Sequence, residues 1–200
     1  MSIKFKNLGF GGEGMRGLFI GRFQPVHNGH LKALEFIFKE VDELIIGIGS
    51  AQVSHTLKNP FTTSERMEML LRALDEAGFD RGRYFLIPLP DINFNSIWAP
   101  YVESIVPKFD VVFTGNSLVA QLFRERGYKV FVQPMFRKDI LSATEIRRRM
   151  LEDESWENLV PKSVVEYIKE IKGVERIKML ATNLEANEKE LQAPIRIPEF

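Results

Sequence analysis

The chain has 200 residues, of which 44% are hydrophobic, and this content is enough for one compact domain with a buried core. Its 27 basic and 27 acidic side chains cancel, which excludes the broad positive field that holds long polyanions such as nucleic acids. The lack of cysteine excludes disulfides and thiolate metal sites, and the apolar runs are too short to span a membrane. We therefore expect a soluble, cytoplasmic protein with neither nucleic acid nor membrane as a partner.

The first 14 residues are polar and end in glycines, and the first convincing strand begins only after them. Residues 1–14 are therefore interpreted as a flexible leader or an added extension. They contain Gly9–Gly14, which matches the GxGxxG pattern of dinucleotide-binding folds. That pattern requires a strand before it and a helix after it, whereas this copy precedes a strand, so we do not expect it to bind a nucleotide.

From Gly17 onward, short apolar runs alternate with segments of helical periodicity. The runs that predict strands are Leu18–Ile20, Leu44–Ile48, Tyr84–Leu89, Val111–Thr114 and Lys129–Val132. The segments that predict helices are Gly29–Glu40, a helix between Thr62 and Gly78, Ile97–Val106 and Leu118–Arg126. This alternation indicates an α/β fold with a doubly wound, Rossmann-like sheet of five parallel strands. Ligands in such sheets bind at the carboxyl ends of the strands, where the winding reverses.

The part of the chain after the sheet predicts further helices. Ser142 and Glu145 have the spacing of a capping box, which marks a helix start. Two more helices are expected near Lys162–Ile171 and Val174–Leu184, whereas the residues from Ala186 onward lack helical periodicity. The expected organisation is a leader (1–14), one domain with C-terminal helices (15–184) and a tail (185–200).

The turn after the first predicted strand, residues 21–30 (GRFQPVHNGH), concentrates polar chemistry at an expected helix start. His27 and His30 are three residues apart, so both rings can lie on one side, next to the positive end of the helix dipole. Gly29 leaves the backbone amides open to a phosphate, and Arg22 adds a positive charge. Two alternatives are a pair of plain surface caps and a zinc site with His55, although the sequence has no HExxH pattern. We favour an anion site.

Residues 21–30 resemble the HxGH signature of the nucleotidyltransferase superfamily, and residues 142–147 (SATEIR) resemble its downstream motif, which is rich in Ser and Thr and ends in arginine. A closer similarity, to the archaeal type of nicotinamide-nucleotide adenylyltransferase, is carried by three segments and extends from Met15 to about Leu180. The segments are residues 49–52 (GSAQ), residues 59–62 (NPFT) with Glu65 and Arg66, and residues 93–98 (NFNSIW). The domain 15–184 would then be a nucleotidyltransferase domain.

The resemblance implies an enzyme that transfers the AMP moiety of ATP to nicotinamide mononucleotide (NMN), forming NAD and pyrophosphate. The attacking phosphate of NMN is already ionised at neutral pH, so substrate alignment and charge neutralisation suffice without a general base. It assigns catalysis to His27, His30, Arg147 and Arg22, with His30 closest to the transferred group. The implied ATP site consists of Gly21, Arg22, Phe23, His27, His30, Lys58, Gly115, Asn116, Ser142, Thr144 and Arg147. The implied NMN site consists of Ser50, Gln52, Asp91, Asn93, Asn95 and Trp98.

Two of these residues, Arg147 and Trp98, have a plain structural alternative, and Lys58 is a less suitable phosphate ligand than an arginine. Residues 147–149 are consecutive arginines that could form a solvated basic face, and because neighbours on a helix point in different directions, at most one reaches the phosphates. Lys58 offers a point charge where a guanidinium would offer a fork of donors. Trp98 would be assigned to the core by its position alone, whereas the resemblance favours stacking on the pyridine ring of NMN.

Mg²⁺ is expected to be carried with ATP and held mostly by phosphates and water, with Asp139 as an indirect contact, because no Asp/Glu cluster has ligand spacing. The archaeal members of the family suggest a homo-oligomer such as a hexamer. One alternative is another HxGH adenylyl- or cytidylyltransferase with a phosphopantetheine, flavin or glycerol phosphate acceptor. Another is a non-catalytic sensor of ATP or NAD, and a mere scaffold would explain neither motif. Asp91–Trp98 favours a flat aromatic acceptor, and the histidines with Arg147 favour catalysis.

Overall fold

The computed structural model describes residues 14–132 and 141–192, with side chains described as far as residue 184. Five strands form one sheet in the order β3-β2-β1-β4-β5, and every pairing is parallel. The strands are β1 (Arg16–Gly21), β2 (Glu43–Gly49), β3 (Tyr84–Leu89), β4 (Val111–Thr114) and β5 (Lys129–Val132). The predicted doubly wound sheet is therefore confirmed, and its winding reverses between β1 and β4.

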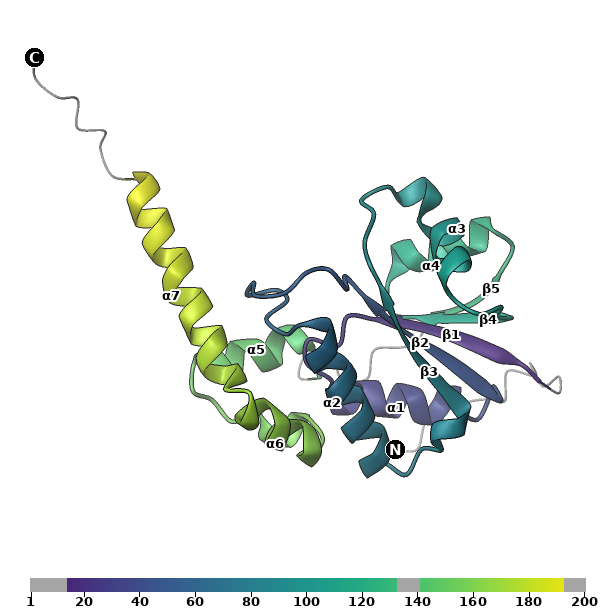
Figure 1. The fold of residues 1–200 in the computed structure, drawn as a ribbon, viewed down its shortest axis with the longest axis horizontal. Coiled ribbons are helices and arrows are strands. Elements are labelled where there is room, and N and C mark those ends of the chain that lie inside the picture. The colour runs from purple at the N-terminus through teal and green to yellow at the C-terminus, as the bar shows by residue number, and fades with distance from the viewer. Residues whose placement is uncertain (1–13, 133–140, 193–200) are drawn as a thin grey trace, which may run out of the picture.

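Helices cover both faces of this sheet (Figure 1). On one face lie α1 (Asn28–Ile37) and α2 (Thr63–Glu76), and on the other lie α3 (Asn95–Ile105) and α4 (Ser117–Glu125). The C-terminal helices α5 (Ala143–Leu151), α6 (Lys162–Glu170) and α7 (Gly173–Gln192) follow, and two short turns of 3₁₀ helix occupy Arg81–Arg83 and Glu157–Leu159. Within the described ranges, no helix has both the length and the apolar character needed to cross a membrane.

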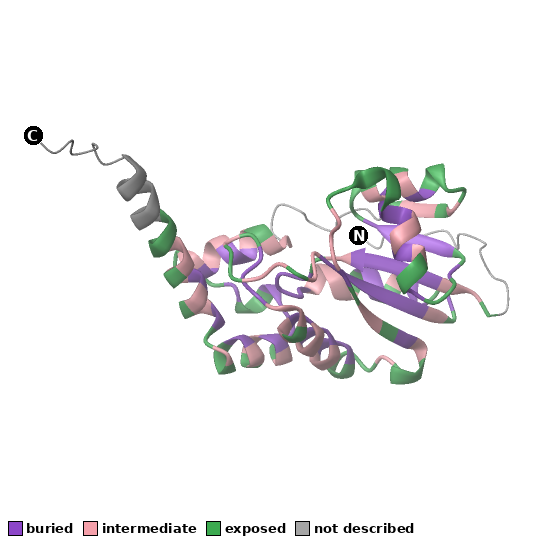
Figure 2. Cartoon of the chain, turned by 45° about the horizontal axis from the view of Figure 1, so that its top comes forward, coloured by how far each residue is buried: buried purple, intermediate pink, exposed green. Residues whose placement is uncertain are grey.

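The central strands are buried on both sides, as Figure 2 shows. Successive side chains of a strand point to opposite faces, so one set packs under α3 and α4 and the alternate set packs under α1 and α2. Leu18, Ile45 and Val112, which are in register on β1, β2 and β4, belong to the first core. Phe19 and Phe113, their neighbours in the chain, belong to the second. This double burial explains why the strands are hydrophobic without alternation.

The predicted start of α2 is confirmed at atomic detail. The Thr62 hydroxyl accepts a hydrogen bond from the Glu65 amide at 3.2 Å, and the Glu65 carboxylate accepts one from the Thr62 amide at 2.8 Å. Gly78, which follows the helix, has a φ of +75°, a conformation that glycine adopts at little cost. The capping box at α5 forms only in part, because Ser142 accepts from the Glu145 amide while the Glu145 carboxylate turns to Arg148 and Arg149.

The last helix is longer than the sequence predicts. The expectation of a helix that ends at Leu184 was wrong, because α7 continues to Gln192. Residues 185–192 are mostly good helix formers such as Glu, Ala, Lys and Leu, so intrinsic propensity extends the helix although the apolar periodicity has ended. The boundaries of the leader and tail stay predictions, since residues 1–13 and 193–200 lie outside the described residues, as does most of Gly9–Gly14.

Candidate active site

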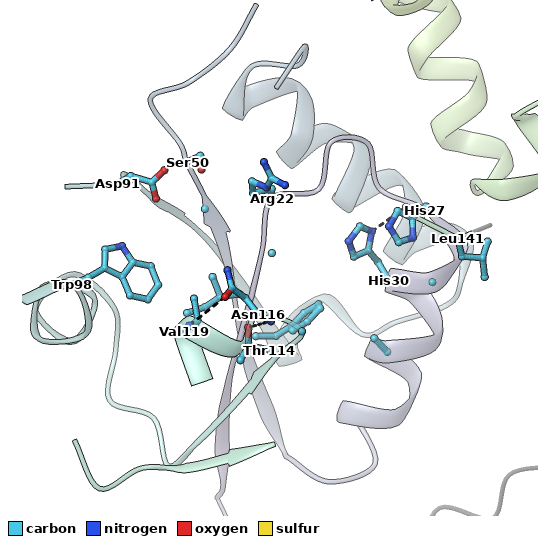
Figure 3. A pocket seen from close by; sticks show the side chains of 17 residues that line it. Arg22, His27, His30, Ser50, Asp91, Trp98, Thr114, Asn116, Val119 and Leu141 are labelled. Atoms are coloured by element: carbon cyan, nitrogen blue, oxygen red, sulfur yellow. Dashed lines mark hydrogen bonds between the residues drawn. The ribbon is translucent and has the colours of Figure 1, made fainter. Parts of the chain in front are cut away.

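A cavity of about 370 Å³ opens at the carboxyl ends of β1, β2 and β4, where the winding reverses. Figure 3 shows Trp98 and Asp91 at one end of this pocket and His27 and His30 at the other, with Arg22 between them. The turn after β1 and the start of α1 contribute Gly21, Arg22, His27, Gly29 and His30. The segments after the other strands contribute Gly49, Ser50, Asp91, Trp98, Thr114, Gly115, Asn116 and Val119. The pocket therefore lies at the edge of the sheet where the sequence predicts ligand binding.

The two histidines form one stacked unit at the start of α1. His27 is the N-cap residue, and its ring lies 3.6 Å from that of His30, centroid to centroid, with an angle of 25° between the planes. The His27 amide donates a hydrogen bond to His30 Nδ1 at 3.1 Å (Figure 3). Because Nδ1 accepts this bond, the neutral His30 ring carries its proton on Nε2. His30 is thereby fixed as an Nε2–H donor.

Burial keeps both imidazoles uncharged. Desolvation lowers the pKa of His27 to about 4. It also lowers the pKa of His30 well below its usual range, and the charge that His27 would carry lowers it further. The Nδ1 atom of His27 is buried without a hydrogen-bond partner among the described residues. At neutral pH the site therefore offers neutral hydrogen-bonding groups in place of imidazolium cations.

Two glycines and a phenylalanine shape the turn that carries these rings. A Cβ atom at Gly29 would lie 2.9 Å from His27 Nδ1, so the glycine leaves room for the His27 ring over the helix start. A Cβ at Gly21 would lie 2.8 Å from the Phe23 ring, which is buried and approaches the His30 ring to 4.8 Å. Phe23 has a φ of +54°, an uncommon value for a residue with a side chain. It supports His30 from behind and does not line the pocket.

Arg147 lies behind the pocket wall, where it joins three segments. Its guanidinium donates to the carbonyl oxygens of Gln24 at 2.7 Å and Leu57 at 2.9 Å, with a longer contact of 3.4 Å to Thr144 Oγ1. Ser142 is the N-cap residue of α5. Leu141 lines the pocket, whereas Ser142, Thr144 and Arg147 do not. Burial and the charge of Arg22 lower the pKa of Arg147 to about 10, so it stays a cation at neutral pH.

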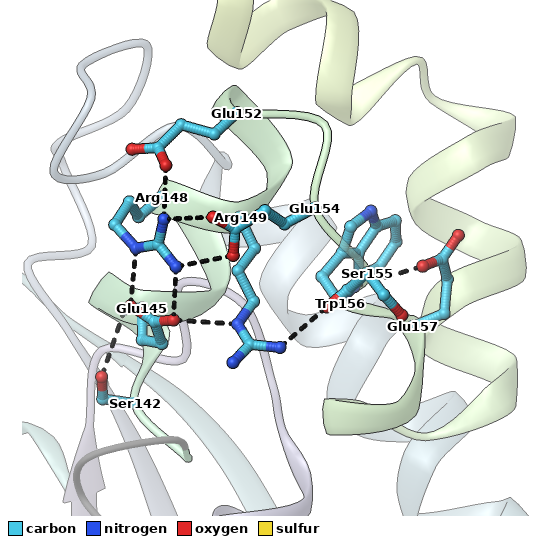
Figure 4. Close-up of polar contacts among 9 residues, drawn as sticks. All are labelled: Ser142, Glu145, Arg148, Arg149, Glu152, Glu154, Ser155, Trp156 and Glu157. Carbon is cyan, nitrogen blue, oxygen red and sulfur yellow. Dashed lines mark hydrogen bonds and ion pairs between the residues drawn. The ribbon is translucent and has the colours of Figure 1, made fainter.

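The two arginines that follow are neutralised by acidic neighbours. Figure 4 shows Arg148 bound to Glu145, Glu152 and Glu154, and Arg149 bound to Glu145 and the carbonyl of Ser155. The hydrogen bonds from Arg148 and then Arg149 lower the pKa of Glu145 to about 2. Of the three consecutive arginines only Arg147 is directed toward the turn after β1, which agrees with the expectation that at most one serves the site.

The residues predicted for the acceptor separate into three groups. Ser50, Asp91 and Trp98 line the pocket. Gln52 stands beside it and binds the backbone of Asp91 twice, donating to its carbonyl at 3.0 Å and accepting from its amide at 2.9 Å. The remaining two, Asn93 and Asn95, are exposed and do not line the pocket, and the same is true of Lys58, which was predicted for ATP.

Trp98 is a buried core residue that also lines the pocket, and its stacking on NMN stays a prediction. It is 9% exposed and meets Phe123 edge-to-face at 6.0 Å, as a core residue would. It also lines the pocket at the end opposite the histidines. At the mouth beside β4, Asn116 caps α4 through its side-chain oxygen, which accepts from the Leu118 amide at 2.9 Å. Gly115 and Asn116 therefore present a fixed backbone to a ligand.

Sequence reasoning missed the roles of two buried polar residues. Gln24 exchanges two hydrogen bonds with the backbone of Phe61, at 2.8 and 3.0 Å, and so joins the turn after β1 to the approach to α2. Arg66 is fully buried and binds carbonyl groups at the pocket edge. The sequence held a signal for it, because Arg66 is in helical phase with the buried Met69, Leu70 and Ala73. Among the described residues, no three His, Cys, Asp or Glu side chains gather to hold a metal.

The sequence is similar to that of known nucleotidyltransferases. A family model described as cytidylyltransferase-like matches residues 18–149. The nicotinamide-nucleotide adenylyltransferase of Thermococcus sibiricus is 87% identical over 93% of this chain and 100% of its own length, and that of Pyrococcus abyssi is 82% identical over the same shares. The one from Saccharolobus solfataricus is 50% identical over 82% of this chain and 95% of its own.

A solved structure shares the fold. The bifunctional NMN adenylyltransferase/ADP ribose pyrophosphatase from Francisella tularensis, complexed with AMP and a manganese ion, superposes with a TM-score of 0.73 at 24% identity. The match covers 93% of this chain and 58% of that one, so the chain spans less than two thirds of the bifunctional protein.

Proposed function

The chain belongs to the nicotinamide-nucleotide adenylyltransferases, enzymes that transfer the AMP moiety of ATP to NMN and release pyrophosphate, and we propose how its pocket carries out this reaction. The observation that carries the proposal is the stacked pair of His27 and His30 at the start of α1, on the sheet edge where the winding reverses. Such a helix start attracts phosphate through its free amides and its dipole.

His30 donates a hydrogen bond to the phosphate that is transferred. In the reaction an oxygen of the NMN phosphate attacks the α-phosphorus of ATP, and the bond to the departing pyrophosphate breaks. Charge then grows on the oxygens around the α-phosphorus, where a donor in a fixed place stabilises the transition state more than the ground state. The Nε2–H of His30 meets this requirement because the His27 amide holds Nδ1 as an acceptor. Both rings bind phosphate, and neither acts as a base.

The arginines supply the charge that the neutral histidines lack. Arg22 lines the centre of the pocket and meets the phosphates directly. The terminal nitrogen of Arg147 that faces Thr144 has only a 3.4 Å contact, which leaves donor capacity for the β and γ phosphates. Ser142 and Thr144 hold the start of α5 for this purpose, and Lys58 adds a screened charge. Gly115 and Asn116 contact the adenosine half of ATP.

NMN occupies the end of the pocket opposite the histidines. Trp98 stacks on the pyridine ring, and Ser50 and Asp91 bind the ribose and the carboxamide. Gln52 fixes Asp91 through the two backbone hydrogen bonds. Asn93 and Asn95, which are exposed and follow Asp91 in the chain, contact the acceptor from outside the pocket.

Mg²⁺ fits this site as a companion of ATP. Asp91 is the one acidic residue among the described residues that line the pocket, so the phosphates and water would provide most of the ligands. The bound ion would neutralise part of the phosphate charge. Asp139, the predicted indirect contact, lies outside the described residues. A cytoplasmic location and a homo-oligomeric assembly, such as a hexamer, remain part of the proposal.

An assay with the purified chain tests the function. The protein is incubated with ATP, NMN and Mg²⁺, and NAD and pyrophosphate are measured together. Phosphopantetheine, flavin mononucleotide and glycerol phosphate replace NMN in parallel reactions. We expect NAD and pyrophosphate in equal amounts. Absence of NAD, or faster transfer to one of the other acceptors, would refute the assignment.

A further inference from the structure

Arg66 is a fully buried cation on α2 that contacts the edge of the active site. Every nitrogen of its guanidinium donates a hydrogen bond to the protein. The acceptors are the carbonyl oxygens of Arg22 (2.9 Å), Gly49 (2.8 Å), Ser50 (3.2 Å) and Thr62 (3.3 Å), and the hydroxyl of Thr63 (3.0 Å). In the part of the chain that the structure describes, no carboxylate forms an ion pair with it. Its rigid fork therefore acts on the backbone.

The carbonyls bound by Arg66 belong to the parts of the backbone that line the pocket. Arg22 follows β1, Gly49 is the last residue of β2, and Ser50 follows it. All three line the cavity. Strand ends leave carbonyls without partners in the sheet, and a buried carbonyl needs a donor. Arg66 supplies that donor to two neighbouring strands at once and joins both of them to the first turn of α2.

Ser50 is held in an uncommon backbone conformation. Its φ is 49°, in the left-handed region that residues with a side chain rarely adopt. Such a conformation persists only where the surroundings enforce it, and it concentrates at functional sites. Arg66 binds the carbonyl of Ser50, and the Thr63 hydroxyl, which accepts from Arg66, donates to the carbonyl of Ala51. Together they fix the Ser50–Ala51 turn.

The Ser50–Ala51 turn is hydrogen-bonded to the backbone at the acceptor end of the pocket. The Ala51 amide donates to the carbonyl of Leu89, the last residue of β3, at 3.2 Å. The next residue, Gln52, binds the backbone of Asp91 twice. Arg66 is thus hydrogen-bonded to Ser50 directly and is connected to Asp91 through Thr63, the Ala51–Gln52 backbone and the Gln52 side chain, and both Ser50 and Asp91 line the pocket.

Arg66 also places a positive charge next to the pocket. Burial and the nearby Arg22 lower the pKa of Arg66 to about 10 against the opposing effect of Asp91, and the group stays protonated at neutral pH. A buried cation that has only neutral dipoles as partners is costly by itself. Its field extends into a pocket that receives phosphates, which offsets part of that cost.

We propose that Arg66 is a positioning residue for the acceptor substrate: by binding the carbonyls of Gly49 and Ser50 it fixes the Ser50 turn and, through Gln52, Asp91. The inference rests on the proposed function, because it assigns these residues to the NMN end. Arg66 does not line the pocket, and the turn that it holds lies at the NMN end, so its loss should change the binding of NMN more than the binding of ATP.

The test compares Arg66→Lys with a matched control, Arg83→Lys. Arg83 also donates to backbone carbonyls, those of Val41 (2.7 Å), Asp42 (2.8 Å) and Phe38 (3.1 Å), but at the opposite end of the sheet. Both variants keep the charge and lose the fork. We expect Arg66→Lys to raise the KM for NMN about tenfold with less than about a threefold change in the KM for ATP, since charge-assisted hydrogen bonds are lost on the acceptor side. Arg83→Lys should leave both constants within about threefold of wild type.

Circular dichroism and thermal unfolding accompany the kinetics. Equal changes in both KM values, or equal effects of the two substitutions, would overturn the positioning role. If Arg66→Lys does not fold, Thr63→Val replaces it as the test, because this substitution removes the hydroxyl between Arg66 and Ala51. A selective rise in the KM for NMN would support the positioning role, and an unchanged KM for NMN would refute it. Absence of NAD formation by the wild type would refute the proposed function, whereas an active wild type without the selective effect refutes only this inference.

Discussion

At the scale of single residues, the tautomer of His30 determines what the site can do. Nδ1 accepts a hydrogen bond from the His27 amide, so Nε2–H is the group of the His30 ring that can donate to a ligand. Such a donor contributes most when charge develops on the phosphate oxygens. We predict that His30→Ala lowers kcat by about 100- to 1000-fold, as the loss of one fixed transition-state donor does elsewhere, while the Kd of ATP rises much less. Steady-state kinetics and calorimetric titration with ATP measure the two effects. Equal losses in kcat and affinity would contradict the assignment.

The same two histidines predict how stability depends on pH. The pKa of His27 falls from 6.5 in the unfolded chain to about 4 in the folded one, and that of His30 falls in the same direction. The unfolded state therefore binds more protons below pH 6.5, and the free energy of unfolding should decrease as pH falls from 6.5 toward 4. Above pH 6.5 this contribution is complete.

Urea unfolding between pH 7.5 and 4.5 checks this prediction in the wild type and in a His27→Gln, His30→Gln double variant. We expect the double variant to lose most of the decrease. Carboxylates such as Glu145, whose pKa falls from 4.5 to about 2, affect stability only at lower pH, so the two contributions separate. A stability that is constant between pH 6.5 and 5 in the wild type, or an equal slope in both proteins, would show that the histidines are not buried in the neutral form.

Not every residue of the site could be predicted from the sequence. The histidines and Arg22 were predictable because one turn between a strand and a helix places them. Lys58, Asn93 and Asn95 were expected to face the substrates but do not line the pocket. The directions of their loops depend on left-handed conformations at Ser50, His55 and Asn93, residues whose type does not require them. The helical phase of Arg66 indicates its burial but not its role in the site, because its partners are backbone carbonyls, which leave no pattern in a sequence.

At the scale of elements, strands and helices were predictable because their periodicities are local. The limits of β3, β4 and β5 agree with the predicted ranges, and the capping box at Thr62 marks the start of α2. Competition between partners was not predictable. Glu145 has the spacing of a cap, but Arg148 and Arg149 lie one helical turn ahead and bind its carboxylate instead. The extension of α7 follows intrinsic helix propensity, which an apolar pattern does not reveal.

An ion pair with little exposure joins α7 to α2, the helix that carries Arg66. Arg176 on α7 donates two hydrogen bonds of 2.7 Å to the Glu65 carboxylate, which also caps α2 through the Thr62 amide. Both side chains are largely buried, with 21% and 15% exposure, so solvent screens the pair only in part.

We predict that Glu65 and Arg176 are energetically coupled. A double-mutant cycle with Glu65→Gln, Arg176→Gln and the double variant, measured by chemical unfolding, should give a coupling energy of about 1–3 kcal/mol, as expected for hydrogen bonds between charged groups with little exposure. The more exposed pair of Arg81 and Asp75 serves as a control and should give at most about 1 kcal/mol. Similar values for both pairs would mean that α7 is not held to α2 by this contact.

At the scale of the whole molecule, the sheet divides the protein into two cores, and the pocket at its carboxyl edge draws on both. The core under α3 and α4 contains Trp98, whereas the core under α1 and α2 contains Trp156, which is 5% exposed and does not line the pocket. In the proposed function, the donor end of the site is therefore built from one face of the sheet, with the histidines, and the acceptor end from the other, with Trp98. The sheet fixes the distance between the two ends.

This division predicts that the two tryptophans report different events. In Trp156→Phe, the remaining Trp98 should change its fluorescence when NMN is added, because a stacked pyridine ring alters its surroundings. In Trp98→Phe, the signal of Trp156 should stay constant. Kinetics add a second criterion: Trp98→Ala should raise mainly the KM for NMN, and Trp98→Phe, which keeps an aromatic face, should raise it less. If Trp98→Ala lowers only the stability and leaves that KM unchanged, Trp98 is a core residue that borders the pocket without binding the acceptor.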